Sequence, residues 1–493
     1  MTADCVVRNG RLVIPGHGVV EADLAIRGET IVEIGQGLAE GRTVIDAGGQ
    51  YVFPGSVDVH MHYGHFNEFY DEMATESKCM TAQGVTTSVI LLDRSVKNME
   101  GWKERLDDPE LFVREPGMLH HMWRASYRKL FPEVIEKSER HSANDFAFHL
   151  LIENEEQIAE IPACHRELGI SSFKFWTGLE GPASLDSGEM WAMLSMCREE
   201  GVLAYANTVN QRLWRRIQRE VEARAETDQR LAGPWGMKEA FPGVVETLDL
   251  HKVLAMAREI GVPELLIAHV TYRDSVAMIR RYRSELGLNV RGETCAAWLS
   301  LTWPEIGDRM GHLATCIIPQ LGYREDAEAL WEGIEGGDIT CIGTDGVISP
   351  RATFPDGRPN PIYRPPPTRE RPGLGFPSHN CMFPVVLHLG LERGLSPVRI
   401  AEVCALNPAE AMRLYPKKGT IAVGSDADLV FVDTSRPHTV TLDDLNTASP
   451  LTPWEGWTLN CWPTLTMLRG TVVCKDGAFL IGPTGRYLPR FPG

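Results

Sequence analysis

The chain has 493 residues, of which 66 are acidic and 49 are basic, so its formal net charge at pH 7 is −17. This acidic balance argues against nucleic acid as the main partner, because phosphate binding needs a basic surface. The first ten residues contain no apolar run of signal-peptide length, and no segment has the roughly 20 uninterrupted apolar residues that a membrane helix needs. We therefore expect a cytoplasmic protein that binds neither nucleic acid nor membranes.

The two ends of the chain share one sequence pattern, in which short predicted strands are separated by turns. Residues 30–35 and 424–432 are examples of brief β-branched or apolar runs bounded by glycine. Such runs are typical of hairpins in a small sheet. We therefore predict one discontinuous β-sandwich domain made of residues 1–53 and 415–493, with a different domain, residues 54–414, between its two parts.

The middle of the chain alternates short apolar strands with amphipathic helices, which is the pattern of βα units around a parallel sheet. Eight candidate strands can be counted, at residues 51–60, 86–92, 146–152, 172–176, 202–208, 265–270, 289–295 and 339–344. Helices are expected between them, for example over residues 244–260, 326–333 and 211–226. Eight such units predict a TIM-type (β/α)₈ barrel, whose active site lies at the C-terminal ends of the strands.

Two histidines, His60 and His62, close the first of these strands. Residues two apart lie on the same face of a strand, so both imidazoles can point at one metal ion. A His-x-His pair alone is a weak signal. Here the pair ends an apolar strand that follows Phe-Pro-Gly and a turn-rich β segment, and this position favours a metal site.

Three further strands carry a residue of the metal-ligand type: Lys174 lies among aromatic residues, and His269 and Asp345 follow apolar runs. A charged lysine is costly to bury. Lys174 therefore predicts either a buried salt bridge or an amine with a lowered pKa that reacts with CO₂, giving a carbamate that bridges two cations. Each residue alone has a structural explanation, but five such residues at strand ends of one barrel favour a metal centre.

These motifs, taken in order, resemble the hydantoinase, dihydropyrimidinase and allantoinase branch of the amidohydrolase superfamily over nearly the whole chain. The resemblance rests on FPGSVDVHMH at residues 53–62, SSFK at 171–174, AHVT at 268–271, GETC at 292–295, TD at 344–345, NPA at 407–409 and GTIAVGSDADL at 419–429. It implies that His60, His62 and Asp345 bind the more buried of two metal ions. It further implies that carbamylated Lys174 bridges the two ions and that His269 binds the second.

The same resemblance implies a reaction. A hydroxide held between two divalent ions would attack a carbonyl carbon, and Asp345 would pass its proton to the leaving nitrogen. Zinc is the default metal for such nitrogen and oxygen ligands, although manganese, cobalt or iron would suit the same site. The implied activity is hydrolysis of a C–N bond in a small-molecule amide, cyclic amide or imide, urea or carbamate. Residues 485–493 resemble tails that dock on a neighbouring subunit in this branch, which implies a homodimer or homotetramer.

One metal ligand of the branch is missing, because Asn207 stands where its members have a histidine at the end of the fifth strand. An amide oxygen is a weaker donor than imidazole for zinc-like ions. Three outcomes follow: Asn207 is a ligand in a binuclear site, the second metal is loosely held, or the site is mononuclear with Lys174 unmodified. Asn210 would replace Asn207 if the alignment shifts.

The predicted substrate pocket also departs from the branch. Leu179 aligns with a tyrosine that supports the oxyanion in the family, and the segment beginning at Ile317 replaces a polar loop that holds a cyclic ureide. These changes disfavour a standard hydantoin or dihydropyrimidine as the substrate. An aromatic first loop suggests an apolar wall, although ordinary loop packing explains it equally well. The residues that we predict to contact substrate are His65, Phe66, Trp176, Leu179, Ile317 and His379.

Two other functions were weighed against hydrolysis. Some relatives of this branch have lost their metals and serve as interaction scaffolds, but such proteins lose several ligands, whereas here only the residue at position 207 differs. A mononuclear deaminase is disfavoured by Lys174, because that reaction needs no bridging carbamate. A metal-dependent hydrolase is therefore the leading hypothesis and a metal-poor scaffold is the alternative.

Overall fold

The computed structural model describes residues 2–65, 67–93, 126–178, 185–348 and 375–492, together with the short strands β8 (Phe112–Val113) and β9 (Met122–Trp123). Two of the predicted substrate contacts, Phe66 and Leu179, lie outside the described residues.

Eight parallel strands form the central sheet in the order β15-β14-β13-β12-β11-β10-β7-β6. They are β6 (Ser56–Met61), β7 (Val85–Leu92), β10 (Asp145–Leu151), β11 (Ser172–Trp176), β12 (Leu203–Asn207), β13 (Leu265–Ile267), β14 (Val290–Cys295) and β15 (Ile339–Gly343). Beyond the end of β15, the carbonyl oxygen of Gly346 accepts a hydrogen bond from His62 N at 3.1 Å, which brings the two edge strands together. The predicted barrel is confirmed, and each predicted strand overlaps one of these eight.

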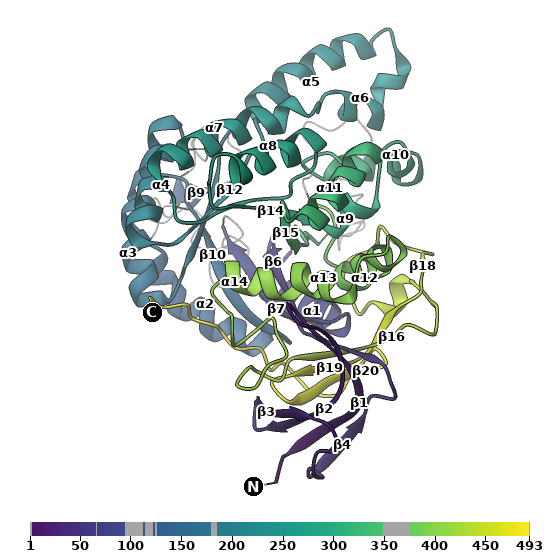
Figure 1. The fold of residues 1–493 in the computed structure, drawn as a ribbon. Coiled ribbons are helices and arrows are strands. Elements are labelled where there is room, and N and C mark those ends of the chain that lie inside the picture. Colours follow the sequence, from purple (N-terminus) through teal and green to yellow (C-terminus); the bar gives the residue numbers. More distant parts are fainter. Residues whose placement is uncertain are drawn as a thin grey trace.

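Helices surround the strands of the barrel (Figure 1). They are α1 (Phe69–Ala82), α2 (Tyr127–His141), α3 (Glu155–Leu168), α4 (Ser187–Glu200), α5 (Gln211–Ala225), α6 (Pro234–Glu239), α7 (Val244–Ile260), α8 (Arg273–Ser284), α9 (Ala296–Ser300), α10 (Glu305–Met310), α11 (Arg324–Gly336), α12 (Met382–Glu392), α13 (Pro397–Ala401) and α14 (Asn407–Ala411). Local sequence sets their ends. For example, Asp186 and Glu189 form a capping box at the start of α4, and Gly201 ends that helix with a left-handed backbone. Within the described ranges, none of these helices has the length and apolar character needed to cross a membrane.

The predicted first strand, residues 51–60, is divided in the structure. Its first part, β5 (Tyr51–Pro54), joins the second sheet, and only β6 belongs to the barrel. The break falls at Gly55, where a Cβ atom would lie 2.0 Å from Thr86 Oγ1. Only glycine lets the backbone pass so close to the neighbouring strand, so the chain changes sheets here.

The second sheet contains nine strands and is built from both ends of the chain, seen in purple and yellow in Figure 1. Its main path is β21-β20-β19-β16-β5-β1-β2-β3, with β4 beside β1. The strands are β1 (Cys5–Ile14), β2 (Gly18–Arg27), β3 (Thr30–Gly35), β4 (Thr43–Asp46), β16 (Leu429–Asp433), β19 (Trp462–Leu468), β20 (Thr471–Lys475) and β21 (Ala478–Phe479). A small pair, β17 (His438–Thr439) and β18 (Thr458–Leu459), lies apart from this sheet. The pairing of β5 with β16 joins the two ends of the chain as expected, while the exact domain boundaries stay predictions.

The tail after β21 packs against this chain's own barrel. Phe146 N donates to the carbonyl oxygen of Arg486 at 3.0 Å, and Leu488 N donates to the carbonyl oxygen of Phe146 at 2.8 Å. The guanidinium of Arg490 is buried and donates to Ser172 Oγ at 3.0 Å and to the carbonyl oxygen of Phe148. Residues 486–490 therefore contact β10 and β11 of their own chain, while Phe491 is 53% exposed. Docking of this tail on a neighbouring subunit stays a prediction. A homodimer or homotetramer stays a prediction.

Candidate metal centre

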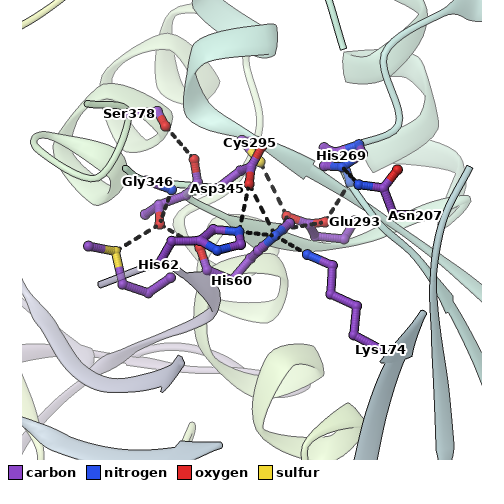
Figure 2. A network of polar contacts seen from close by, with 12 residues as sticks. His60, His62, Lys174, Asn207, His269, Glu293, Cys295, Asp345, Gly346 and Ser378 are labelled. Carbon is purple, nitrogen blue, oxygen red and sulfur yellow. Dashed lines mark hydrogen bonds and ion pairs between the residues drawn. The ribbon is translucent and has the colours of Figure 1, made fainter. Parts of the chain in front are cut away.

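The ends of strands β6 and β15 bring three predicted ligands together (Figure 2). Asp345 Oδ1 lies 3.1 Å from His60 Nε2 and 3.2 Å from His62 Nε2, and the two Nε2 atoms are 3.2 Å apart. His60 is fully buried, and the side chain of Asp345 is 15% exposed. These three residues therefore form a compact group of nitrogen and oxygen donors at the C-terminal end of the barrel.

A buried carboxylate, Asp58, holds this group in place. Its Oδ1 accepts hydrogen bonds from His60 N and Thr344 N, both at 3.0 Å, and its Oδ2 accepts one from Thr344 Oγ1 at 2.8 Å. Asp58 thereby ties the end of β6 to the residue before Asp345. Burial raises the pKa of Asp58 to about 7, with the hydrogen bonds opposing that rise.

Two of the predicted ligands have an unusual backbone conformation. The φ angle is +33° at His269 and +45° at Asp345, which is the left-handed region that residues with a side chain seldom adopt. Such conformations persist only where the surrounding structure enforces them. Each of these residues is the second after the end of its strand, β13 or β15, and both side chains lie beside the group shown in Figure 2.

Lys174 extends from β11 toward the same centre (Figure 2). It is 1% exposed, and its Nζ is within hydrogen-bonding distance of His60 Nε2. Burial lowers the pKa of Lys174, although Asp345 and Glu293 oppose this effect. Burial alone would raise the pKa of Asp345, but His60 and the other neighbouring histidines hold it well below the usual range for a carboxyl group. Asp345 is therefore ionised, and Lys174 is an amine that loses its proton more readily than usual.

Glu293 joins the two halves of the site and was not among the predicted site residues. It is fully buried, and its carboxylate lies 3.3 Å from His60 Nδ1 and accepts the backbone N–H of His269 at 2.6 Å. Tyr205 donates its hydroxyl to Glu293 Oε2 at 2.9 Å and lies 2.8 Å from His60 Nδ1. A carboxylate behind a ligand histidine fixes the orientation of its ring. The signal in the sequence was an acidic residue within a predicted barrel strand, in the GETC segment.

The donor set at His60, His62 and Asp345 fits a divalent metal ion. Metal–ligand bonds of about 2.0–2.2 Å place neighbouring ligand atoms roughly 3.0–3.4 Å apart, which matches the separations in this group. Without a cation between them, two imidazole nitrogens and a carboxylate oxygen that face one point would direct their lone pairs at one another, which is unfavourable. Glu293 and Tyr205 contact His60 Nδ1, which leaves Nε2 as the nitrogen that faces the centre.

The other half of the site is arranged differently. Asn207 Nδ2 lies 2.9 Å from His269 Nε2, while Asn207 Oδ1 accepts a hydrogen bond from Val209 N at 3.3 Å. An amide nitrogen does not bind a cation, so Asn207 would have to turn its amide over to serve as a ligand. The ring of Trp298 stacks on His269 with centroids 6.2 Å apart. His269 lies beside the site as predicted, whereas metal binding by Asn207 stays a prediction.

The fallback ligand Asn210 has another role. Its Oδ1 accepts Leu213 N at 2.9 Å and so caps the N-terminus of α5, while its Nδ2 donates to Asp249 at 3.0 Å. Both ends of its amide are therefore occupied by helix capping and by Asp249. The structure corrects the suggestion that Asn210 replaces Asn207 as a ligand.

The predicted substrate contacts that the structure describes are distributed unevenly. His65 lies next to His62, with ring centroids 4.9 Å apart. Trp176 is the last residue of β11, two residues after Lys174. Ile317 is 2% exposed and follows the short helix at 311–316. His379 is buried behind the site and pairs through Nε2 with Glu76 Oε2 at 2.7 Å. His379 is thus paired with a residue of α1, and this pairing disfavours a direct contact between its side chain and a substrate.

The chain was compared with known proteins. The model of the amidohydrolase family matches residues 51–473. Among characterised relatives, D-hydantoinase of Ralstonia pickettii is 26% identical over 99% of both chains, and allantoinase of Rubrobacter xylanophilus is 26% identical over 98% of this chain and 97% of its own. D-hydantoinase (dihydropyrimidinase) from Thermus sp. superposes with a TM-score of 0.80 at 25% identity and covers 99% of both chains. Because the family match spans the whole barrel with its metal-type residues, this chain belongs to the amidohydrolase family.

Proposed function

We propose that this protein is a metal-dependent hydrolase that cleaves a C–N bond in a small cyclic amide or a related amide, imide, urea or carbamate. The observation that carries this proposal is the buried group of His60, His62 and Asp345, with Lys174 directed at the same point. Support also comes from the relatives, which are named as hydantoinases and allantoinases. Family membership favours an enzyme over an interaction scaffold, because the chain retains this donor group.

His60, His62 and Asp345 would hold one divalent ion, for which zinc is the default choice. Lys174, as a carbamate, and His269 would hold a second ion. Bound there, divalent ions would polarise a substrate carbonyl and lower the pKa of water. The interior position of Lys174 suits carbamate formation, in which the amine nitrogen bonds to the carbon of CO₂ and releases one proton.

Asp345 is placed to move a proton during the reaction. Its carboxylate is ionised and lies at the mouth of the barrel, partly exposed, where a reacting group can reach it. From this position it would accept a proton from the attacking water and deliver it to the leaving nitrogen. Glu293 and Asp58 would hold the histidines and the Thr344 backbone in register without contacting the substrate.

The proposed substrate differs from a standard hydantoin or dihydropyrimidine. Ile317 is apolar and buried where the branch has a polar loop, and Trp176 lies at the end of the strand that carries Lys174. These two residues support a pocket with more apolar surface and fewer hydrogen-bonding groups than a ureide needs. We therefore expect cyclic amides or imides with an apolar substituent to be better substrates than unsubstituted ureides.

The proposal is tested by metal analysis and activity together. Protein purified without chelator is expected to hold bound zinc-like ions and to hydrolyse members of a panel of cyclic amides, imides, ureas and carbamates. We expect Lys174→Ala to lose a bound ion and to lack activity. A single tightly held ion that survives Lys174→Ala would contradict the binuclear site. Absence of activity on the whole panel with zinc, manganese, cobalt and iron would contradict the hydrolase function itself.

A further inference from the structure

A second group of donor atoms lies on the far side of His62 from Asp345. It consists of His62, His65 and Asp93, whose potential ligand atoms all lie within 4.8 Å of one another. Asp93 Oδ2 is 3.9 Å from His62 Nδ1 and 3.8 Å from His65 Nε2. Asp93 follows the end of β7, and His65 belongs to the loop after β6, so this group is also at the C-terminal end of the barrel.

The separations in this group are too long for hydrogen bonds. An N–H···O hydrogen bond spans about 2.7–3.2 Å, whereas Asp93 stands 3.8 and 3.9 Å from the two ring nitrogens. Ligands that share one zinc-type ion with bonds of about 2.0–2.2 Å lie roughly 3.0–3.4 Å apart, as at the first site. The two distances to Asp93 are longer than a hydrogen bond, and they exceed the separation of ligands around one ion by only about 0.5 Å, so a small movement of these side chains would let them share an ion.

A second observation points to a ligand at the same place. His62 is 5% exposed, and among the residues that the structure describes its buried Nδ1 has no hydrogen-bond partner. A ligand histidine ordinarily donates its second ring nitrogen to a carboxylate, a carbonyl or water. Here His62 Nδ1 is directed toward Asp93 but lies 3.9 Å from its Oδ2, which is too far for a hydrogen bond.

We propose that His62, His65 and Asp93 form a further site for a transition-metal ion of the zinc type. Two imidazoles and one carboxylate suit zinc or copper, whereas magnesium and calcium prefer sets of oxygen ligands. His62 would bind the first ion through Nε2 and this one through Nδ1, and its ring proton would leave to solvent. The site depends on the proposed function only in sharing His62, whose Nδ1 faces Asp93 while its Nε2 faces Asp345.

The test is a count of bound ions in the full-length protein. After dialysis against Zn²⁺ and gel filtration, the unmodified protein is expected to hold one more zinc per chain than His65→Gln or Asp93→Asn. The double variant should lose the same single ion, because both residues serve one site. The controls His17→Gln and Asp71→Asn, which change exposed residues, should keep the full number of ions. Mg²⁺ supplied in place of Zn²⁺ should not fill the site.

The outcomes separate this site from the proposed hydrolase centre. Lys174→Ala should keep the ion held by His65 and Asp93 even if it loses another. If His65→Gln and Asp93→Asn, shown to be folded by circular dichroism, bind as many zinc ions as the unmodified protein, this site does not exist. That result would leave the centre at His60, His62 and Asp345 untouched. Should Asp93→Asn fail to fold, His65→Gln decides the question, because His65 is partly exposed on a loop.

Discussion

Lys174 in the barrel and Lys418 beside the second sheet are 1% and 2% exposed, but their electrostatic surroundings are opposite. Lys418 Nζ pairs with Asp145, Asp426 and Asp428 at 2.6, 2.9 and 2.7 Å. These carboxylates outweigh burial and raise the pKa of Lys418. At Lys174 burial outweighs the nearby carboxylates and lowers the pKa. The amine of Lys174 faces an imidazole, and no ion pair between it and a carboxylate is found among the described residues.

The contrast shows what a buried lysine can be used for. Around Lys418, three carboxylates of this chain are paired with that lysine, and Arg469 forms a further pair with Asp145. That group joins β10 of the barrel to the residues around β16, so its role is to hold the two sheets together. Around Lys174, the nitrogen and oxygen donor atoms of His60, His62 and Asp345 face one point. The first arrangement is complete without a ligand, and the second is suited to receive one.

The largest expected effect separates the two lysines by activity. Lys174→Met should lower kcat/KM on the best substrate by about 10³-fold or more, which corresponds to roughly 4 kcal/mol, because a ligand and the bridging carbamate are lost together. Its thermal midpoint should stay close to that of the unmodified protein when both are measured without added metal. Steady-state kinetics and calorimetry check the two statements. Activity within tenfold of the unmodified protein would place Lys174 outside the machinery.

The next effect is on stability. Lys418→Met should lower the free energy of unfolding by about 3–5 kcal/mol, because the buried Asp426 and Asp428 lose their ion pairs and Asp145 keeps only Arg469. Lys417→Met, at the exposed neighbouring position, is the matched control and should change it by no more than about 0.5 kcal/mol. Denaturant titrations of the two variants give the comparison. Equal stability of both variants would show that the ion group does not join the sheets.

A buried carboxyl group, Glu246 on α7, tests whether burial outweighs local interactions in setting a pKa, as it does for Lys174. Burial raises the pKa of Glu246 to about 7 from an ordinary value of 4.5, although Thr271 N donates to it at 3.2 Å. The folded state then keeps a proton that the unfolded state releases, so stability should fall as the pH rises from about 4.5 to about 7. The loss is on the order of 3 kcal/mol. Unfolding measured across this range should be flatter in Glu246→Gln, and an unchanged slope would refute the assignment.

The smallest effect concerns the carboxylate behind the ligands. Glu293→Gln should weaken zinc binding by about 10- to 100-fold, since the ring of His60 loses its charged partner while the ligands themselves remain. Competition with a chromogenic chelator measures this affinity. Glu199→Gln, on the exposed side of α4, is the control and should bind zinc as the unmodified protein does. Unaltered affinity in Glu293→Gln would mean that Tyr205 alone orients His60.

The sequence allowed most of the fold to be predicted, because each barrel strand is a short apolar run with its own turn signals. The strand 172–176 was predicted with its observed bounds, and the other barrel strands were shifted by a few residues at their ends. The domain boundary was predicted after residue 53, but residues 51–60 were predicted as one strand, since a continuous apolar run gives no sign that the strand is divided at Gly55. The packing of residues 486–490 on this chain's own barrel was not predicted, because these residues carry no local pattern that identifies the surface they contact.

Within the site, residues at strand ends could be predicted and residues that act through contacts could not. His60, His62 and Asp345 meet because parallel strands end at one edge of the barrel. The roles of Glu293 and Asp93 depend on which strands are neighbours and on side-chain directions, neither of which is visible in a single sequence. Position 207 shows the same limit, because composition does not tell which atom of an amide faces a neighbouring histidine.

The pairing of β5 with β16 has a consequence for the order in which the protein is made. Residues 51–54 leave the ribosome early, but their partner strand at 429–433 is synthesised only after the whole barrel. The tail that contacts β10 and β11 is made later still. A nascent chain can therefore assemble its barrel strands before β16 has paired with β5 and before the tail has covered its contact surface on β10. Premature termination after residue 414 would leave an edge strand and apolar surface exposed, which are the features that chaperones and proteases recognise.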